Sequence, residues 1–168
     1  MPLPDSLPNT KPRPSGSGNQ PTPWILREIR PDDAEAAARL CGELDYPVSA
    51  EEMAERIRTQ TALADHVIFV ACLPDRSVAG WIDVHITHYL QTGPRAEIGG
   101  LVVGDGTRSQ GIGRGLVARA EAWAAARGMT HMMVRSRISR ERAHQFYLRE
   151  GYQRTKTSAV FAKELNRP

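Results

Sequence analysis

A glycine-rich segment at residues 108–116, RSQGIGRGL, has the residue types and the spacing of an anion-binding turn. Its glycines are Gly111, Gly113 and Gly115, and the segment lies between the apolar run GGLVVG and an amphipathic stretch. Where a strand turns into a helix, glycines let backbone N–H groups point inward, and the first turn of the helix adds partial positive charge. The expected ligand is therefore a phosphate or a pyrophosphate.

Two well-known phosphate-binding motifs do not fit this segment. A nucleotide-hydrolysing P-loop requires GxxxxGK[ST], but Arg114 follows Gly113, so the lysine and the magnesium ligand are both missing. A dinucleotide fingerprint requires GxGxxG and an acidic residue about 20 positions later. Here the spacing is GxGxG, and the next predicted strand ends in Arg135, Ser136 and Arg137, which have the wrong charge for a ribose diol.

A coenzyme A cradle is the third class of site, and two motifs support it. Residues 108–113, RSQGIG, fit the pattern R/Q-x-x-G-x-G/A between an apolar strand and an amphipathic helix. Residues 141–152, ERAHQFYLREGY, fit A-x-x-F-Y-x-x-x-G-F/Y. In these two motifs, and in the order of its strands and helices, the chain resembles the GNAT superfamily of acyl-CoA N-acyltransferases.

The resemblance implies a site for acetyl-CoA as co-substrate, without a metal ion. In the family, the strand before the turn splays from the next strand, and the pantetheine arm pairs with the backbone of the strand before the turn. In this sequence the resemblance assigns that role to Leu101, Val102 and Val103. Arg108 either adds charge near the phosphates or forms an ordinary salt bridge. Backbone N–H groups of the turn then hold the pyrophosphate, and the residues assigned to it are Gln110, Gly111, Ile112, Gly113, Arg114 and Gly115.

The resemblance also assigns two catalytic residues for the attack of an amine on a thioester. Tyr147 matches the tyrosine that the family places near the sulfur, and a phenol with a pKa near 10 suits protonation of the leaving thiolate; packing alone is the alternative. Glu97 matches a glutamate of the histone-acetyltransferase branch and is the candidate base, with an ion pair to an arginine as the alternative. A backbone N–H near Val103 would hold the oxyanion. His85 and His88 are weaker candidates for the base.

The implied function is transfer of an acetyl group from acetyl-CoA to an amine, by direct attack in a ternary complex. The acceptor is a small primary amine or a peptide amine.

In one departure from the family, Arg140 stands where many members carry an asparagine that touches pantetheine. The alternative function is a non-catalytic acyl-CoA-binding sensor or partner module. Acidic residues between positions 42 and 53 suit a cationic amine, namely Glu43, Asp45, Glu51 and Glu52.

A mixed sheet is needed to position these residues. Strand patterns cover residues 24–31, 65–73, 78–90, 96–103 and 131–136, with one or two further strands after Gly151. Helical patterns cover residues 32–45, 112–127, 140–150 and a stretch opening at Ser49, and capping boxes begin at Asp32 and Ser49. The predicted fold is α/β (α+β) and GNAT-like. Its mostly antiparallel sheet has roughly 6–7 strands, is flanked by about four helices, and splays between the fourth and fifth strands. The pair Gly99–Gly100 predicts a bulge or a close backbone approach.

Composition limits the remaining possibilities. The 168 residues include 22 Lys+Arg and 19 Asp+Glu, and a net charge of +3 is too weak to indicate nucleic-acid binding. No apolar run approaches about 18 residues, so no membrane span is predicted. Residues 1–23 are predicted to be a flexible tail, without the apolar core of a signal peptide, before a single domain at 24–168. Cys41 and Cys72 lack metal-ligand spacing. A cytoplasmic location is the remaining default, and a homodimer is one assembly that the sequence allows.

Overall fold

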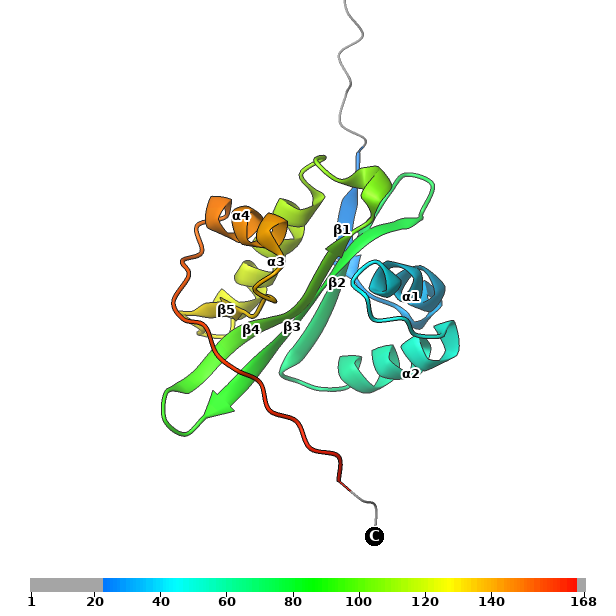
Figure 1. The fold of residues 1–168 in the computed structure, drawn as a ribbon. Coiled ribbons are helices and arrows are strands. Elements are labelled where there is room, and N and C mark those ends of the chain that lie inside the picture. Colours follow the sequence, from blue (N-terminus) through cyan, green and yellow to red (C-terminus); the bar gives the residue numbers. More distant parts are fainter. Residues whose placement is uncertain (1–22, 166–168) are drawn as a thin grey trace, which may run out of the picture.

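The computed structural model describes residues 23–165, which form a five-stranded sheet with helices on both faces (Figure 1). The strands lie in the order β1-β2-β3-β4-β5, and all neighbours are antiparallel except β4 and β5, which are parallel. The strands are β1 (Ile25–Glu28), β2 (His66–Cys72), β3 (Val78–Tyr89), β4 (Gly93–Val103) and β5 (Met132–Val134). The helices are α1 (Ala34–Gly42), α2 (Ala50–Thr61), α3 (Ile112–Ala125) and α4 (Glu141–Arg149), with short 3-10 turns at Pro31–Asp33 and Asp105–Thr107.

Two hydrophobic clusters, one on each face of the sheet, form the core. On one face Phe69 of β2 is buried with Leu116 of α3. On the other face Val70 of β2 is buried with Leu40 of α1 and Ile57 of α2. Figure 1 shows the same division, with α1 and α2 on one side of the sheet and α3 and α4 on the other. Because β2 is covered on both faces, its sequence is a continuous apolar run rather than an alternating one.

The first two helices begin with different interactions. The Ser49 side chain accepts a hydrogen bond from the Glu52 N–H over 3.1 Å, so Ser49 caps α2 as predicted. The Glu52 carboxylate pairs with Arg56 instead of completing the predicted box. The predicted capping box at Asp32 is wrong, because α1 begins after a 3-10 turn. There the carboxylate of Asp33 accepts two hydrogen bonds from the Arg27 guanidinium, at 2.7 and 2.8 Å. A bidentate ion pair of this kind fixes the turn to β1 more strongly than a cap does.

The predicted bulge in β4 is confirmed at Gly99. Asp83 of β3 pairs with Gly100 and Val84 pairs with Ile98, so Gly99 is the extra residue. A Cβ on Gly99 would lie 2.6 Å from Asp83 Oδ2, which leaves no room for a side chain. The bulge therefore depends on glycine because the neighbouring carboxylate occupies the space.

The mixed, mostly antiparallel sheet with four helices is confirmed within residues 23–165, but the strand count is lower than predicted. The strands predicted after Gly151 are wrong, because residues 152–165 contain neither helix nor strand. A strand pattern becomes a strand only beside a partner edge, and β5 offers an edge of three residues. Val160, Phe161 and Leu165 are instead exposed.

Two further sequence predictions concern regions beyond this fold. The flexible tail is predicted for residues 1–23, and its residues Met1 to Thr22 lie outside the described part of the chain. Among the described helices, none combines the length and the apolar composition that crossing a bilayer requires.

Candidate active site

The sheet opens between β4 and β5. Strand β5 pairs with residues 96–98 of β4, whereas β4 continues to Val103. In the described part of the chain, no other strand pairs with this last stretch on the β5 side. The splay predicted between the fourth and fifth strands is therefore present, and Figure 1 shows β4 running past the short β5 toward the turn before α3.

Backbone groups of two of the three predicted strand residues point into this opening. The Gly104 N–H donates to Ala79 O over 2.8 Å, which places Val103 at a position without direct hydrogen bonds to β3. The N–H groups of Val103 and Leu101 therefore face the opening. Val102 has the opposite orientation, and its side chain is buried on the face covered by α1. Its backbone is engaged with β3, so it offers nothing to the opening.

The turn between β4 and α3 contains two residues with positive φ. These are Ser109, at 66°, and Gly111, at 79°, and Gly111 is the N-cap residue of α3. Glycine adopts this left-handed conformation without steric penalty. The first N–H groups of this 14-residue helix have no intrahelical acceptor, and its first turn contains no acidic side chain. The geometry therefore suits an anion, as the glycine pattern predicts.

The other two glycines lie against aromatic side chains. A Cβ on Gly113 would lie 3.3 Å from the Phe146 ring, and a Cβ on Gly115 would overlap the Trp24 ring. Trp24 also donates its Nε1–H to Gln110 O over 3.2 Å, so it supports the turn from the side of β1. Sequence patterns missed Trp24 because it lies far from the turn along the chain.

Arg108 forms the salt bridge that the sequence left open as an alternative. Its guanidinium pairs with Asp105 and lies 3.8 Å from the nearest Glu43 carboxylate oxygen. Its Nε donates to Val103 O over 3.2 Å. Arg108 therefore braces the end of β4 and occupies the Val103 carbonyl, while the Val103 N–H still faces the opening.

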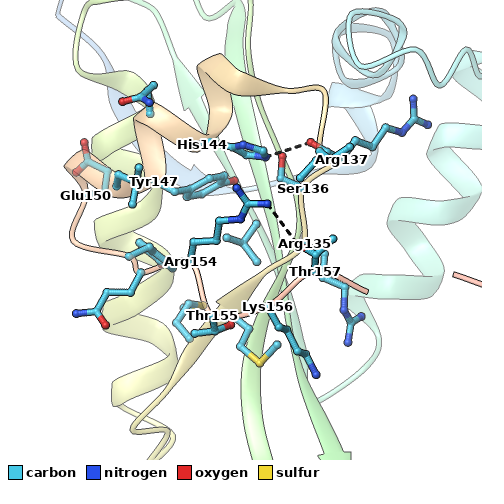
Figure 2. A pocket seen from close by; sticks show the side chains of 18 of the residues that line it. Arg135, Ser136, Arg137, His144, Tyr147, Glu150, Arg154, Thr155, Lys156 and Thr157 are labelled. Atoms are coloured by element: carbon cyan, nitrogen blue, oxygen red, sulfur yellow. Dashed lines mark hydrogen bonds between the residues drawn. The ribbon is translucent and has the colours of Figure 1, made fainter. Parts of the chain in front are cut away.

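Tyr147 lies on α4 and lines an open cavity of about 1080 Å³ between β5, α4 and residues 152–160 (Figure 2). Its ring packs edge-on against Phe146 and Tyr152, with centroids 5.2 and 5.5 Å apart. Phe146 turns the other way and contacts Gly113. Residues 110–115 do not line this cavity. Phe146 therefore links α4 to the turn, while Tyr147 faces the cavity.

Burial raises the pKa of Tyr147 to about 12, above the ordinary value of 10.0. The phenol is therefore a weaker acid than the sequence argument assumed, although it is protonated at neutral pH. Folding favours the neutral form, so this stabilisation is present below the ordinary pKa and is lost as the pH rises through about 12.

We expect the tyrosinate absorbance of the wild type and of Tyr147→Phe to coincide up to a pH of about 11 and to separate only above it. A spectrophotometric titration of both folded proteins measures this difference. A loss of absorbance in the variant already at a pH of about 10 would contradict the assigned burial.

Glu97 is a buried carboxylate with one paired and one unpaired oxygen. Its residue exposure is 4%, its Oε1 accepts from the Arg135 guanidinium over 2.7 Å, and its Oε2 has no hydrogen-bond partner among the described residues. Arg135 also donates to Tyr89 OH over 3.0 Å, and these two contacts raise its pKa. Arg135 and Tyr147 both line the cavity, whereas Glu97 does not line it. The ion pair to an arginine that the sequence left open for Glu97 is therefore present, although sequence patterns did not identify Arg135 as the partner.

The weaker base candidates lie on β3. His85 is the cross-strand neighbour of Glu97, whereas His88 is exposed and contacts Asp65 over 3.2 Å. Position therefore favours His85 over His88 as a residue near the site.

Two arginines after β5 contact the loop between α1 and α2. Arg137 donates to Tyr46 OH over 2.7 Å, and Arg140 donates to Leu44 O over 2.7 Å. Arg140 also lies 3.4 Å from the Asp45 carboxylate. The position where the family carries asparagine therefore ties α4 to this loop.

The acidic residues of this loop region are partly neutralised. Asp45 faces Arg140, and Glu43 lies near both Arg39 and Arg108. These contacts weaken the expectation that the segment attracts a cationic amine through free negative charge.

Comparison with known proteins gives one family and several relatives. Residues 27–152 match the model of the acetyltransferase (GNAT) family. The aminoglycoside N(6')-acetyltransferase type 1 of Stenotrophomonas maltophilia is 27% identical over 144 residues, which cover 83% of this chain and 93% of that protein. The aminoalkylphosphonate N-acetyltransferase of Salmonella typhimurium strain LT2 is 32% identical over 136 residues, which cover 77% and 85%.

A solved structure shows the same fold. It is an aminoglycoside N-acetyltransferase in complex with CoA, with a TM-score of 0.77 and 16% identity, and the match covers 88% of this chain and 99% of that one. At this identity the likeness concerns the fold.

Proposed function

This chain belongs to the GNAT acetyltransferase family, and from that premise we propose that it transfers an acetyl group from acetyl-CoA to an amine of a small molecule. Both curated relatives are named as N-acetyltransferases of small amines. The related structure in complex with CoA supports acetyl-CoA as the donor.

The observation that carries this proposal is the unpaired end of β4 directly before the left-handed turn at Gly111. An extended arm can add to this edge as a strand would, by pairing with the backbone of Leu101 and Val103. The N-terminus of α3 then receives the pyrophosphate. In this arrangement a free backbone N–H near Val103 that the arm does not use holds the thioester carbonyl and stabilises its oxyanion.

The buried side chains supply the proton transfers. The amine attacks the carbonyl carbon of the thioester and forms the C–N bond, and Glu97 accepts the amine proton directly or through a water molecule. The C–S bond then breaks, and Tyr147 gives its phenolic proton to the leaving thiolate and regains a proton from solvent. The unpaired Oε2 of Glu97 supports its role as the base. The role of Tyr147 rests on its place in the family's helix motif within α4.

An assay of CoA release over a panel of amines tests the proposed function. The panel contains an aminoglycoside, an aminoalkylphosphonate, an N-terminal peptide amine and a lysine peptide, and mass spectrometry identifies the acetylated product. We expect at least one small amine to be acetylated faster than both peptides. Tight binding of acetyl-CoA without acetylation of any amine would instead favour the sensor module.

Substitution of Gly111 tests the acetyl-CoA turn. Valine is strained at the left-handed φ of 79°, whereas asparagine tolerates it. A strain of about 1–2 kcal/mol that distorts the turn corresponds to roughly tenfold weaker binding. We therefore expect Gly111→Val to raise the Kd of acetyl-CoA about tenfold and Gly111→Asn to raise it much less, as measured by calorimetry.

Gly128 provides the matched control, because it has a φ of 77° near the other end of α3. Gly128→Val should lower the Tm as Gly111→Val does, but it should leave the Kd of acetyl-CoA unchanged. Equal loss of affinity in both valine variants would mean that the effect comes from α3 stability and not from the turn.

A further inference from the structure

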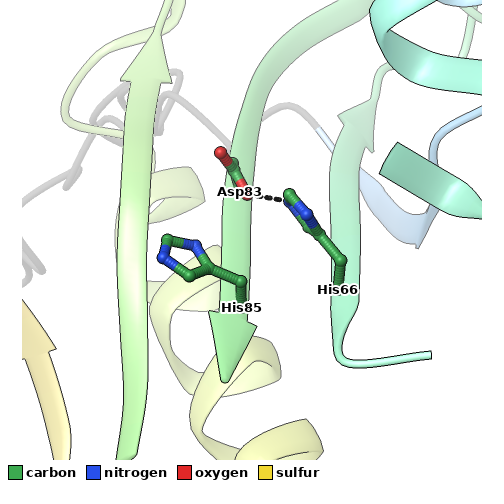
Figure 3. A group of neighbouring side chains, drawn as sticks. All are labelled: His66, Asp83 and His85. Carbon is green, nitrogen blue, oxygen red and sulfur yellow. Dashed lines mark hydrogen bonds and ion pairs between the residues drawn. The ribbon is translucent and has the colours of Figure 1, made fainter. Parts of the chain in front are cut away.

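Three potential metal ligands lie together on the sheet face covered by α1 and α2, away from the turn before α3. They are His66 of β2 and Asp83 and His85 of β3 (Figure 3). Each offers one ligand atom, and these atoms all lie within 4.8 Å of one another. His66 Nε2 contacts Asp83 Oδ1, and the two imidazole ring centres are 5.6 Å apart.

The register of two central strands brings this group together. His66 is the direct cross-strand partner of His85, and Asp83 precedes His85 by two residues, so all three side chains point to the same face. The intervening Val84 points to the opposite face and is fully buried there. The ligands are therefore held by the core of the sheet rather than by a loop.

Gly99 lies directly against the group. A Cβ at this bulged residue would lie 2.6 Å from Asp83 Oδ2 and 3.4 Å from His85 Cε1. The second carboxylate oxygen therefore faces a position where any other residue would place a side chain. The side chains of His66 and Asp83 are 11% and 23% exposed, so the group is enclosed but open to small solutes.

From this geometry we propose that His66, Asp83 and His85 bind a divalent first-row transition-metal ion. Neutral imidazole nitrogens suit Zn²⁺, Co²⁺ or Ni²⁺, whereas Mg²⁺ and Ca²⁺ prefer oxygen ligands. The ion would replace the proton shared by His66 and Asp83, and its binding would release that proton. Three protein ligands leave at least one coordination position for water or another small ligand.

The site adjoins the proposed catalytic carboxylate without being part of the proposed acetyl transfer. His85 is the cross-strand neighbour of both His66 and Glu97, so the three residues form a row across β2, β3 and β4. The metal site stands on its own geometry, and its test does not require turnover.

Titration of untagged, EDTA-treated full-length protein with Co²⁺ tests the proposal. Calorimetry should give one ion per chain, and visible absorption should show ligand-field bands with imidazole coordination. Zn²⁺ should displace Co²⁺, whereas an excess of Mg²⁺ should not. Absence of stoichiometric Co²⁺ and Zn²⁺ binding by the folded wild-type protein would overturn the proposal and leave a hydrogen-bonded His–Asp pair.

Variants distinguish this site from adventitious binding. Asp83→Asn and His85→Gln should each weaken Co²⁺ binding by more than about 100-fold, since changes in outer-shell partners alone cost 10–100-fold. Gly99→Ala retains all three ligands but fills the adjacent space, and it should weaken binding about tenfold or more. His88→Gln removes an exposed histidine of the same strand and should leave binding unchanged. Loss of binding only in His88→Gln would also overturn the assignment.

Discussion

Replacing Tyr147 with phenylalanine should lower kcat for the best amine acceptor by about 100-fold, which corresponds to about 3 kcal/mol of activation free energy. The change removes the proton donor for the thiolate but keeps the ring, so the contacts with Phe146 and Tyr152 remain. The Kd of acetyl-CoA should stay within about threefold of the wild-type value, because the turn is untouched. Single-turnover kinetics and calorimetry measure the two quantities.

Tyr152→Phe is the matched control for this prediction. It removes a hydroxyl from the neighbouring ring of the same aromatic cluster, and it should leave kcat within about twofold of the wild-type value. If the two variants lose the same rate, the loss reflects packing around α4. If Tyr147→Phe retains the wild-type rate of the chemical step, Tyr147 is a packing residue.

Replacing Glu97 with glutamine should also lower kcat about 100-fold, because the amide has the shape of the carboxylate but accepts no proton from the attacking amine. Because Glu97 is buried, we expect no other side chain to accept the amine proton easily in its place. Raising the pH should restore part of the rate, since more of the amine is then already unprotonated. Rates with one amine at several pH values check both expectations.

Arg135→Gln separates the two roles of Glu97, which are the ion pair with Arg135 and the acceptance of the amine proton. This variant breaks the 2.7 Å ion pair from its exposed side but keeps the carboxylate. We expect a small loss of rate, within about fivefold, and a clear drop in Tm, because the buried carboxylate of Glu97 loses the arginine that pairs with it. A loss as large as that of Glu97→Gln would show that the ion pair, rather than proton transfer, explains the effect.

The local features of the site were predictable from the sequence because each depends on residues close together in the chain. The turn at Gly111 follows from consecutive glycines between a strand and a helix, and the structure shows the left-handed φ there. The adjacent pair Phe146 and Tyr147 point in different directions because helical residues are about 100° apart. The bulge at Gly99 follows from a glycine pair within a strand.

The strand count shows where a local pattern fails. Residues after Gly151 are predicted to form one or two strands, yet those described up to residue 165 pair with no edge. Residue types describe which segments could form a strand, but the hydrogen bonds of a strand come from a neighbour. The available edge is set by β5, whose three residues end where Arg135 turns toward Glu97.

The sequence by itself determined the family, the order of most strands and helices, and the position of the glycine turn, because motifs and periodicity are properties of short segments. The tertiary structure alone decided that Trp24 supports the turn, that Arg135 pairs with Glu97, and that His66 lies beside His85. These contacts join residues distant in the chain, and strand register together with core packing selects them. A shift of one residue in that register would turn His66 to the opposite face and separate the metal ligands.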